Sequence, residues 1–171
     1  MTKKALITGI TGQDGAYLSQ FLLGKGYQIY GGVRRGSTDS TWRLEELQVQ
    51  DHIEPIFLEL LEESNLIYIV KTLQPDEIYN LGAMSFVRTS FDYPLYTANV
   101  VGLGAMRLLE AIRQESPHTR FYQASSSEMF GKVKASPQSE QTPFHPRSPY
   151  AISKCFGHFS VLNYREAYNI H

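Results

Sequence analysis

Residues 5–15 read Ala-Leu-Ile-Thr-Gly-Ile-Thr-Gly-Gln-Asp-Gly, an apolar run that passes through three evenly spaced glycines into a helical pattern. This order predicts a strand, a tight turn and the start of a helix. Gly9 suits the turn, Gly12 has no Cβ to block a ligand, and Gly15 lets the helix pack on the strand. The N-terminus of such a helix suits a pyrophosphate. We therefore interpret the stretch as a nucleotide-binding loop; the alternative is a plain strand-to-helix turn.

The composition fits one α/β domain, because 171 residues with 42% hydrophobic side chains can bury a sizeable core. Sixteen basic and seventeen acidic residues give a net charge of −1, which provides no field that attracts nucleic acid. Cys155 is the only cysteine, which excludes an intrachain disulfide and favours a reducing compartment. The sequence shows no metal-ligand spacing, signal peptide or membrane span. We expect a cytoplasmic protein that binds neither metal, membrane nor nucleic acid.

Apolar segments alternate with helical patterns along the rest of the chain. After the first helix, strands are predicted at residues 27–33, 53–58, 77–81 and 121–124. Helices are predicted around Trp42, at 66–73, from a cap at Asp92 to about 117, and from 150 onward. Alternation without hairpin signals predicts a doubly wound parallel sheet of the Rossmann type, with ligands beyond the carboxyl ends of its strands.

The second predicted strand ends in two arginines, Arg34 and Arg35, about 20 residues past the glycines. In dinucleotide-binding folds an acidic residue here bonds the ribose 2′-hydroxyl of NAD, whereas an arginine accommodates the 2′-phosphate of NADP. Two arginines without an acid therefore predict NADP. The alternative is a basic turn exposed to solvent.

Tyr150 and Lys154 lie four residues apart on the last predicted helix, after a proline-marked loop at residues 129–149. A lysine at this spacing lies near the phenol and favours its ionised form, so we expect a lowered Tyr150 pKa and a base for an alcohol. The alternative is an ordinary surface pair. The periodicity also predicts four side chains that face the sheet: Ile152, Cys155, Phe159 and Leu162.

The glycine spacing and the Tyr-x-x-x-Lys motif resemble the extended short-chain dehydrogenase/reductases. Longer stretches resemble the GDP-mannose 4,6-dehydratase family within them, at residues 8–15, 33–35, 77–83, 121–125, 127–128 and 146–150. The resemblance covers essentially the whole chain. Because that family continues into a substrate-binding region beyond the Tyr150 helix, we expect part of a longer enzyme. The alternative is a nucleotide-binding module without activity.

The resemblance implies two sets of site residues. The catalytic set is Ser126, Glu128, Tyr150 and Lys154. The NADP contacts are Gly9, Ile10, Thr11, Gly12, Gln13, Asp14, Gly15, Arg34, Arg35, Gly36, Ser37, Glu59, Leu60, Leu81, Gly82, Ala83, Met84, Ser85, Tyr96 and Lys154. Some positions depart from the family, since Glu59 replaces an aspartate, Met84 and Phe86 replace polar residues, and Ser126 replaces a frequent threonine.

The implied reaction converts GDP-mannose to GDP-4-keto-6-deoxymannose, a step of GDP-fucose biosynthesis. Tyr150 takes the proton of the sugar 4-hydroxyl, Glu128 removes the C5 proton and assists loss of the 6-hydroxyl, and Ser126 bonds the C4 oxygen. Other nucleotide-sugar dehydratases or epimerases are the alternative. The family also implies a homo-oligomer, a dimer or tetramer, with residues 34–43 at a subunit contact.

Overall fold

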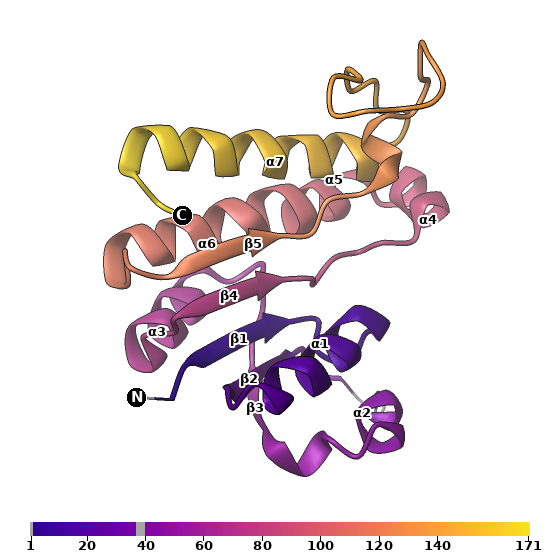
Figure 1. Ribbon diagram of the computed structural model, residues 1–171. Helices are drawn as coiled ribbons and strands as arrows, with labels where there is room; N and C mark the ends of the chain where they lie inside the picture. The colour runs from indigo at the N-terminus through magenta and orange to yellow at the C-terminus, as the bar shows by residue number, and fades with distance from the viewer. Residues whose placement is uncertain (1, 37–39) are drawn as a thin grey trace.

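The computed structural model describes residues 2–36 and 40–171, and within them five parallel strands form one sheet. The strands are β1 (Lys4–Thr8), β2 (Gln28–Val33), β3 (Ile53–Phe57), β4 (Glu77–Asn80) and β5 (Arg120–Gln123). Their order across the sheet is β3-β2-β1-β4-β5, so the chain returns to the centre after β3 (Figure 1). This order reverses beside β1, the position at which doubly wound sheets bind nucleotides. The predicted fold class is confirmed.

Helices connect the strands on both faces of the sheet. They are α1 (Gln13–Gly24), α2 (Trp42–Glu46), η1 (Gln50–His52), α3 (Glu63–Leu73), α4 (Val87–Asp92), α5 (Pro94–Thr97), η2 (Ala98–Leu103), α6 (Gly104–Glu115), η3 (Ser127–Met129) and α7 (Pro149–Tyr168). In the described part of the chain, no helix has both the length and the apolar character that crossing a bilayer requires.

Successive residues of the central strands enter two separate cores. Leu6 and Ile78 belong to a cluster with side chains of α3, α6 and α7, whereas Ala5 and Ile7 pack with side chains of α1 and α2. Strands buried on both faces read as continuous apolar runs. The apolar run at residues 5–7 was predicted as a strand, and the structure shows that this strand is the central one. The helix layers leave the carboxyl ends of the strands open for a site.

The long helix predicted after Asp92 is present, but it begins differently. α5, η2 and α6 follow one another from Pro94 to Glu115, and η2 is a π-helical segment. Asp92 is not its cap, because it ends the preceding helix α4 and forms an ion pair with Arg88 at 3.8 Å. The sequence interpretation missed α4. Tyr93 occupies the N-cap position of α5, and Pro94 its first turn.

α7 begins at a capped N-terminus and buries one side. Ser148 accepts a hydrogen bond from the Ala151 backbone at 3.1 Å, a typical N-cap. The prediction that Ile152 and Phe159 face the sheet is wrong, since both are 58% exposed. Phe159 instead contacts Phe144 of the preceding loop, with ring centroids 6.2 Å apart. The buried side of α7 packs mainly on η2 and α6, and it carries small residues, the two motif residues and Tyr164.

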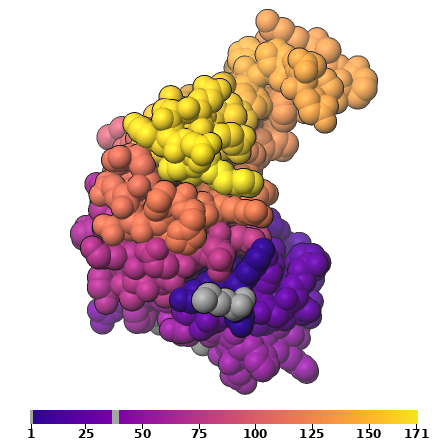
Figure 2. Space-filling model, turned by 60° about the vertical axis from the view of Figure 1, so that its left-hand side comes forward, coloured from indigo at the N-terminus to yellow at the C-terminus, as the bar shows by residue number. Residues whose placement is uncertain are grey.

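The loop at residues 130–148 has no regular secondary structure and stands out from the body of the molecule (Figure 2). Its base is held by aromatic contacts, because Phe144 lies 5.1 Å from the rings of both Phe130 and His158. The predicted long connection before α7 is therefore confirmed, and it joins η3 to the catalytic helix.

Gly15 illustrates how the glycine loop constrains packing. A Cβ at this position would lie 2.6 Å from the Ile10 carbonyl oxygen and 2.7 Å from that of Gly9. We expect Gly15→Ala to lower the free energy of unfolding by about 1–3 kcal/mol, the usual cost of overpacking. Gly24→Ala is the control, because Gly24 lies on the same helix with no atom near the added Cβ. Urea denaturation measures both; equal stabilities of the two variants contradict the packing role.

Candidate cofactor and active site

The glycine loop leaves β1 through a turn that only glycine fits. Gly9 has φ of +67°, and a Cβ there would lie 2.9 Å from the Gly82 nitrogen. The Gly12 N–H donates to the Gly9 carbonyl at 3.0 Å and closes the turn. Gly12 is the N-cap of α1 and no side chain caps that end, so the first N–H groups of the helix face the loop. This arrangement suits a phosphate group.

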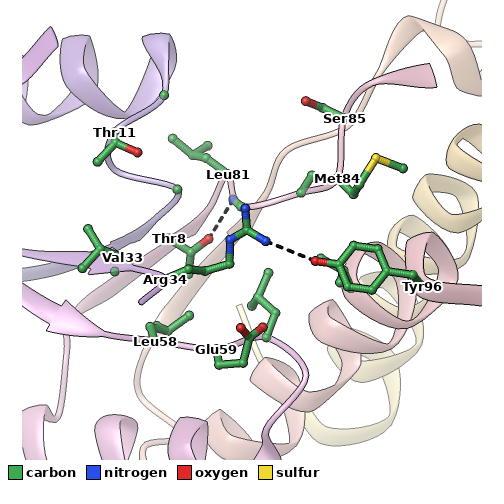
Figure 3. A pocket seen from close by; sticks show the side chains of 17 residues that line it. Thr8, Thr11, Val33, Arg34, Leu58, Glu59, Leu81, Met84, Ser85 and Tyr96 are labelled. Atoms are coloured by element: carbon green, nitrogen blue, oxygen red, sulfur yellow. Dashed lines mark hydrogen bonds between the residues drawn. The ribbon is translucent and has the colours of Figure 1, made fainter. Parts of the chain in front are cut away.

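A cavity of about 300 Å³ opens beside this loop at the carboxyl ends of the strands (Figure 3). Twelve of its lining residues were predicted as cofactor contacts, namely Gly9, Thr11, Gly12, Arg34, Glu59, Leu60, Leu81, Gly82, Ala83, Met84, Ser85 and Tyr96. Its volume lies at the lower end of the range for small-molecule sites. Segments that are far apart in the sequence thus meet at one place.

Five lining residues were not predicted: Thr8, Gly32, Val33, Leu58 and Val100. Thr8 and Val33 end strands, Gly32 is the next-to-last residue of β2, and Leu58 directly follows β3. The prediction considered the loops after the strands, although a strand's final side chains reach the same edge. The position of Val100 follows from Tyr96, because residues four apart share one face of a helix.

Arg34 and Tyr96 meet across the mouth of this cavity. The Arg34 guanidinium Nη1 donates to the Tyr96 hydroxyl at 3.1 Å, which joins the end of β2 to α5 (Figure 3). The Glu59 carboxylate also belongs to the lining, and it accepts a hydrogen bond from the Leu61 backbone at 3.2 Å. A base and an acid therefore stand at the same end of the cavity.

The other predicted contacts lie outside the cavity lining. Ile10 is 1% exposed and packs in the core with α1, so its side chain cannot reach a ligand. Gly15 is buried under the loop, and Ser37 lies outside the described residues. Lys154 is buried on α7 and does not line the cavity either. Exposed positions near the loop or after β2 make up the rest: Gln13, Asp14, Arg35 and Gly36.

Three predicted catalytic residues come together beyond β5. Ser126 is the N-cap of η3, and its Oγ accepts a hydrogen bond from the Glu128 backbone at 3.2 Å. The Ser126 hydroxyl acts to lower the pKa of Tyr150, and the charge of Glu128 acts to raise it. Tyr150 is 7% exposed, whereas Glu128 is exposed. A hydroxyl, a phenol and a carboxylate are thus within reach of one substrate position.

Lys154 lies below Tyr150 on α7 but does not lower the pKa of the phenol. Its Nζ donates to the Ala124 carbonyl at 2.8 Å and lies 5.8 Å from the centroid of the Tyr150 ring. Burial lowers the pKa of Lys154 to about 8. The expected lowering of the Tyr150 pKa is wrong for this structure, because burial raises it and outweighs the hydrogen bond with Ser126.

A protein-family model described as GDP-mannose 4,6 dehydratase matches residues 6–171. The chain belongs to the GDP-mannose 4,6-dehydratase family. A GDP-mannose 4,6-dehydratase of Yersinia enterocolitica is 53% identical over 176 residues, covering 99% of this chain and 47% of the relative. A GDP-mannose 4,6 dehydratase 2 of Arabidopsis thaliana is 51% identical over 178 residues, covering 98% of this chain and 48% of the relative. The chain spans about half the length of these curated relatives.

Solved structures of nucleotide-sugar enzymes share the fold of this family member. A dTDP-glucose 4,6-dehydratase from Streptomyces venezuelae, solved with NAD bound, superposes with a TM-score of 0.84 at 20% identity. The likeness covers 98% of this chain and 53% of that structure. At this identity the likeness establishes the doubly wound architecture, so activity and cofactor choice depend on this chain's own residues.

Proposed function

We propose that this chain is the cofactor-binding and catalytic half of an NADP-dependent GDP-mannose 4,6-dehydratase, a hydro-lyase acting on GDP-mannose. The observation that carries the proposal is the meeting of Ser126, Glu128 and Tyr150 beyond β5. Family membership and about 50% identity to GDP-mannose 4,6-dehydratases support the substrate. Without the remainder of the protein this half alone is expected to be inactive.

The residues around the cavity fit a dinucleotide. The bare N-terminus of α1 and the absent Cβ of Gly12 provide donors and space for a pyrophosphate, and Arg34 provides a charge for a 2′-phosphate. Glu59 is suited to hold an adenine amino group, and Tyr96 completes the lining beside Arg34. A bound nicotinamide would supply the hydride acceptor for C4 and the hydride donor for C6, and Tyr150 would supply the proton that C5 then takes up.

Each catalytic side chain then has a separate task. Tyr150 removes the proton of the 4-hydroxyl, and Ser126 donates a hydrogen bond to that oxygen as its charge changes. Lys154 donates to the Ala124 carbonyl and so holds the end of β5 beside the Tyr150 ring. Glu128 removes the C5 proton, which the 4-ketone has made acidic, and protonates the leaving 6-hydroxyl. The charge of Glu128 raises the pKa of Tyr150.

A second candidate is a nucleotide-sugar epimerase, which needs Tyr150 and Lys154 but no group for elimination. Glu128 favours the dehydratase, because its carboxylate is exposed beside Tyr150 and no cation is paired with it among the ion pairs of the described residues. The test is incubation of the full-length protein with GDP-mannose and NADP. A product lighter by one water supports the dehydratase, and a product of unchanged mass supports the epimerase.

We also propose NADP rather than NAD as the cofactor, because a 2′-phosphate forms charge-assisted bonds with arginine and NAD lacks this group. NADP is expected to bind the unaltered protein more tightly than NAD. An Arg34→Ala, Arg35→Ala double variant is expected to lose about 3–6 kcal/mol of NADP binding free energy, at roughly 1.5–3 kcal/mol for each of two charge-assisted bonds, with NAD affinity nearly unchanged. Fluorescence titration measures both cofactors, and Arg120→Ala at the amino end of β5 is the control. Equal affinities for both cofactors, or NADP binding unaffected in the double variant, count against the choice.

Several properties of the whole protein belong to the same proposal. Family membership supports a cytoplasmic, homo-oligomeric enzyme of nucleotide-sugar metabolism whose product enters GDP-fucose biosynthesis. In the proposed oligomer, the segment of residues 34–43, of which residues 37–39 lie outside the described part of the chain, contacts a neighbouring subunit. Arg43 anchors the described end of this segment, because its Nη1 donates to the Thr11 carbonyl at 3.3 Å.

A further inference from the structure

The last paired residues of three adjacent strands carry side chains that bond to one another. Thr8 of β1 lies in register with Asn80 of β4, and Asn80 with Gln123 of β5. The Thr8 hydroxyl donates to Asn80 Oδ1 at 2.7 Å, and Asn80 Nδ2 donates to Gln123 Oε1 at 2.8 Å. Thr8 and Asn80 are each 1% exposed. We call Thr8, Asn80 and Gln123 the polar row.

Both ends of the polar row join the proposed site. At one end, the Gly82 N–H of the cavity lining donates to Thr8 Oγ1 at 2.9 Å. At the other end, Gln123 Nε2 donates to the Ala124 carbonyl at 3.1 Å, and Lys154 Nζ donates to the same oxygen at 2.8 Å. A continuous series of hydrogen bonds therefore runs from the cofactor cavity to the catalytic helix.

The polar row also stands where three site segments leave the sheet. Gly9 follows Thr8, the lining segment from Leu81 to Ser85 follows Asn80, and Ala124 precedes the segment with Ser126 and Glu128. Apolar side chains at these positions would hold the strands together without fixing a direction. Hydrogen bonds at fixed lengths and angles specify the relative position of the three strand ends.

We propose that Asn80 is a positioning residue for the proposed dehydratase reaction, which it serves by holding Lys154 at a fixed place relative to the cofactor cavity. Asn80 touches neither substrate nor cofactor in this role. It acts through Gln123 and the Ala124 carbonyl on one side and through Thr8 on the other. The expected effect of Asn80 on turnover rests on the proposed function, whereas its expected effect on NADP binding does not require turnover.

Asn80→Leu keeps the number and branching of the non-hydrogen side-chain atoms and removes both bonds at the centre of the polar row. Because a misplacement of about 1 Å can cost roughly 100-fold in rate, we expect kcat of the full-length enzyme to fall about 10- to 100-fold. The KM for GDP-mannose is expected to stay nearly constant, since no substrate contact is removed. Retention of kcat by Asn80→Leu overturns the proposal.

Thr119→Val is the matched control for a purely structural effect. Thr119 is 0% exposed, lies beside the opposite end of β5, and donates to the Pro75 carbonyl at 2.6 Å and to Ser116 Oγ at 2.9 Å. Its replacement removes a buried hydrogen-bonding group far from the site. We expect lower stability with kcat unchanged. An equal loss of kcat in this control overturns the proposal, because the effect of Asn80 is then one of general stability.

Gln123→Met gives a second variant that leaves the Thr8–Asn80 bond in place, should Asn80→Leu not fold. The binding test is a double-mutant cycle that combines Gln123→Met with Lys154→Met. It measures NADP affinity and requires no turnover. If the two residues are coupled, the fold-loss of NADP affinity in the double variant is expected to differ by at least about threefold from the product of the fold-losses in the two single variants. Losses that simply multiply overturn the coupling. If the unaltered enzyme leaves GDP-mannose unchanged, the proposed function fails, while this cycle still decides the inference.

Discussion

Glu128→Gln is expected to lower dehydration of GDP-mannose by the full-length enzyme about 10²- to 10⁴-fold, the usual contribution of a general acid or base. Glutamine keeps the size of the side chain and removes its basicity. Removal of the C5 proton and loss of the 6-hydroxyl then fail together, whereas oxidation at C4 remains possible. NADP affinity is expected to stay unchanged, because Glu128 lies outside the cavity lining.

The measurements are product formation and solvent-deuterium exchange at C5, which should decline in parallel. Glu140→Gln is the matched control, because Glu140 is also an exposed glutamate, in the loop that follows η3. Its activity is expected to equal that of the unaltered enzyme. If Glu128→Gln dehydrates at a near-normal rate, Glu128 is a bystander and the epimerase alternative regains support.

The cofactor cavity could be predicted from sequence because its parts are short and local. The glycine loop has a characteristic order of residue types, and each later contact directly follows an apolar run. Once the strands are taken as parallel, their carboxyl ends must share an edge. Gly9, Arg34 and Gly82 then fall into one cavity without any knowledge of register.

The polar row could not be predicted, because it depends on register. Thr8, Asn80 and Gln123 are unremarkable polar residues until the strands are aligned residue by residue. A shift of one residue would send these side chains to opposite faces of the sheet. α4 was missed for another reason, since residues 87–92 are too few to show helical periodicity.

The error about Tyr150 has an electrostatic cause. Spacing along a helix predicts that Lys154 lies near the phenol, but it does not reveal how deeply either group is buried. Burial raises the pKa of Tyr150 and lowers that of Lys154 to about 8, so it works against the charged form of each group, although Lys154 still carries its charge at neutral pH. The 2.8 Å bond to the Ala124 carbonyl further directs the ammonium toward β5. A base at this position therefore needs additional positive charge near the phenol, which the cationic nicotinamide provides when bound.

The pH dependence of C4 oxidation follows from these two groups. Tyr150 acts as a base only when ionised, and its pKa is raised, so the rate is expected to increase as the pH rises toward neutrality and above. Lys154 loses its charge above a pH of about 8, which weakens the charge-assisted bond that holds its Nζ on the Ala124 carbonyl beside the phenol. The increase should therefore weaken at alkaline pH, as stopped-flow absorbance of NADPH can show.

Tyr150→Phe is expected to abolish the first step, with C4 oxidation reduced about 10²- to 10⁴-fold and no bound NADPH detected after GDP-mannose is added. Phenylalanine retains the ring that packs in the core but cannot accept the proton. Tyr164→Phe is the matched control, because Tyr164 lies on the same helix, is 6% exposed, and donates its hydroxyl to Glu110 instead of facing the site. This control should lose some stability and keep its oxidation rate. Normal NADPH formation by Tyr150→Phe would remove the base from the proposed mechanism. If Tyr150→Phe forms no NADPH while Glu128→Gln still forms it, the two residues are assigned to successive steps.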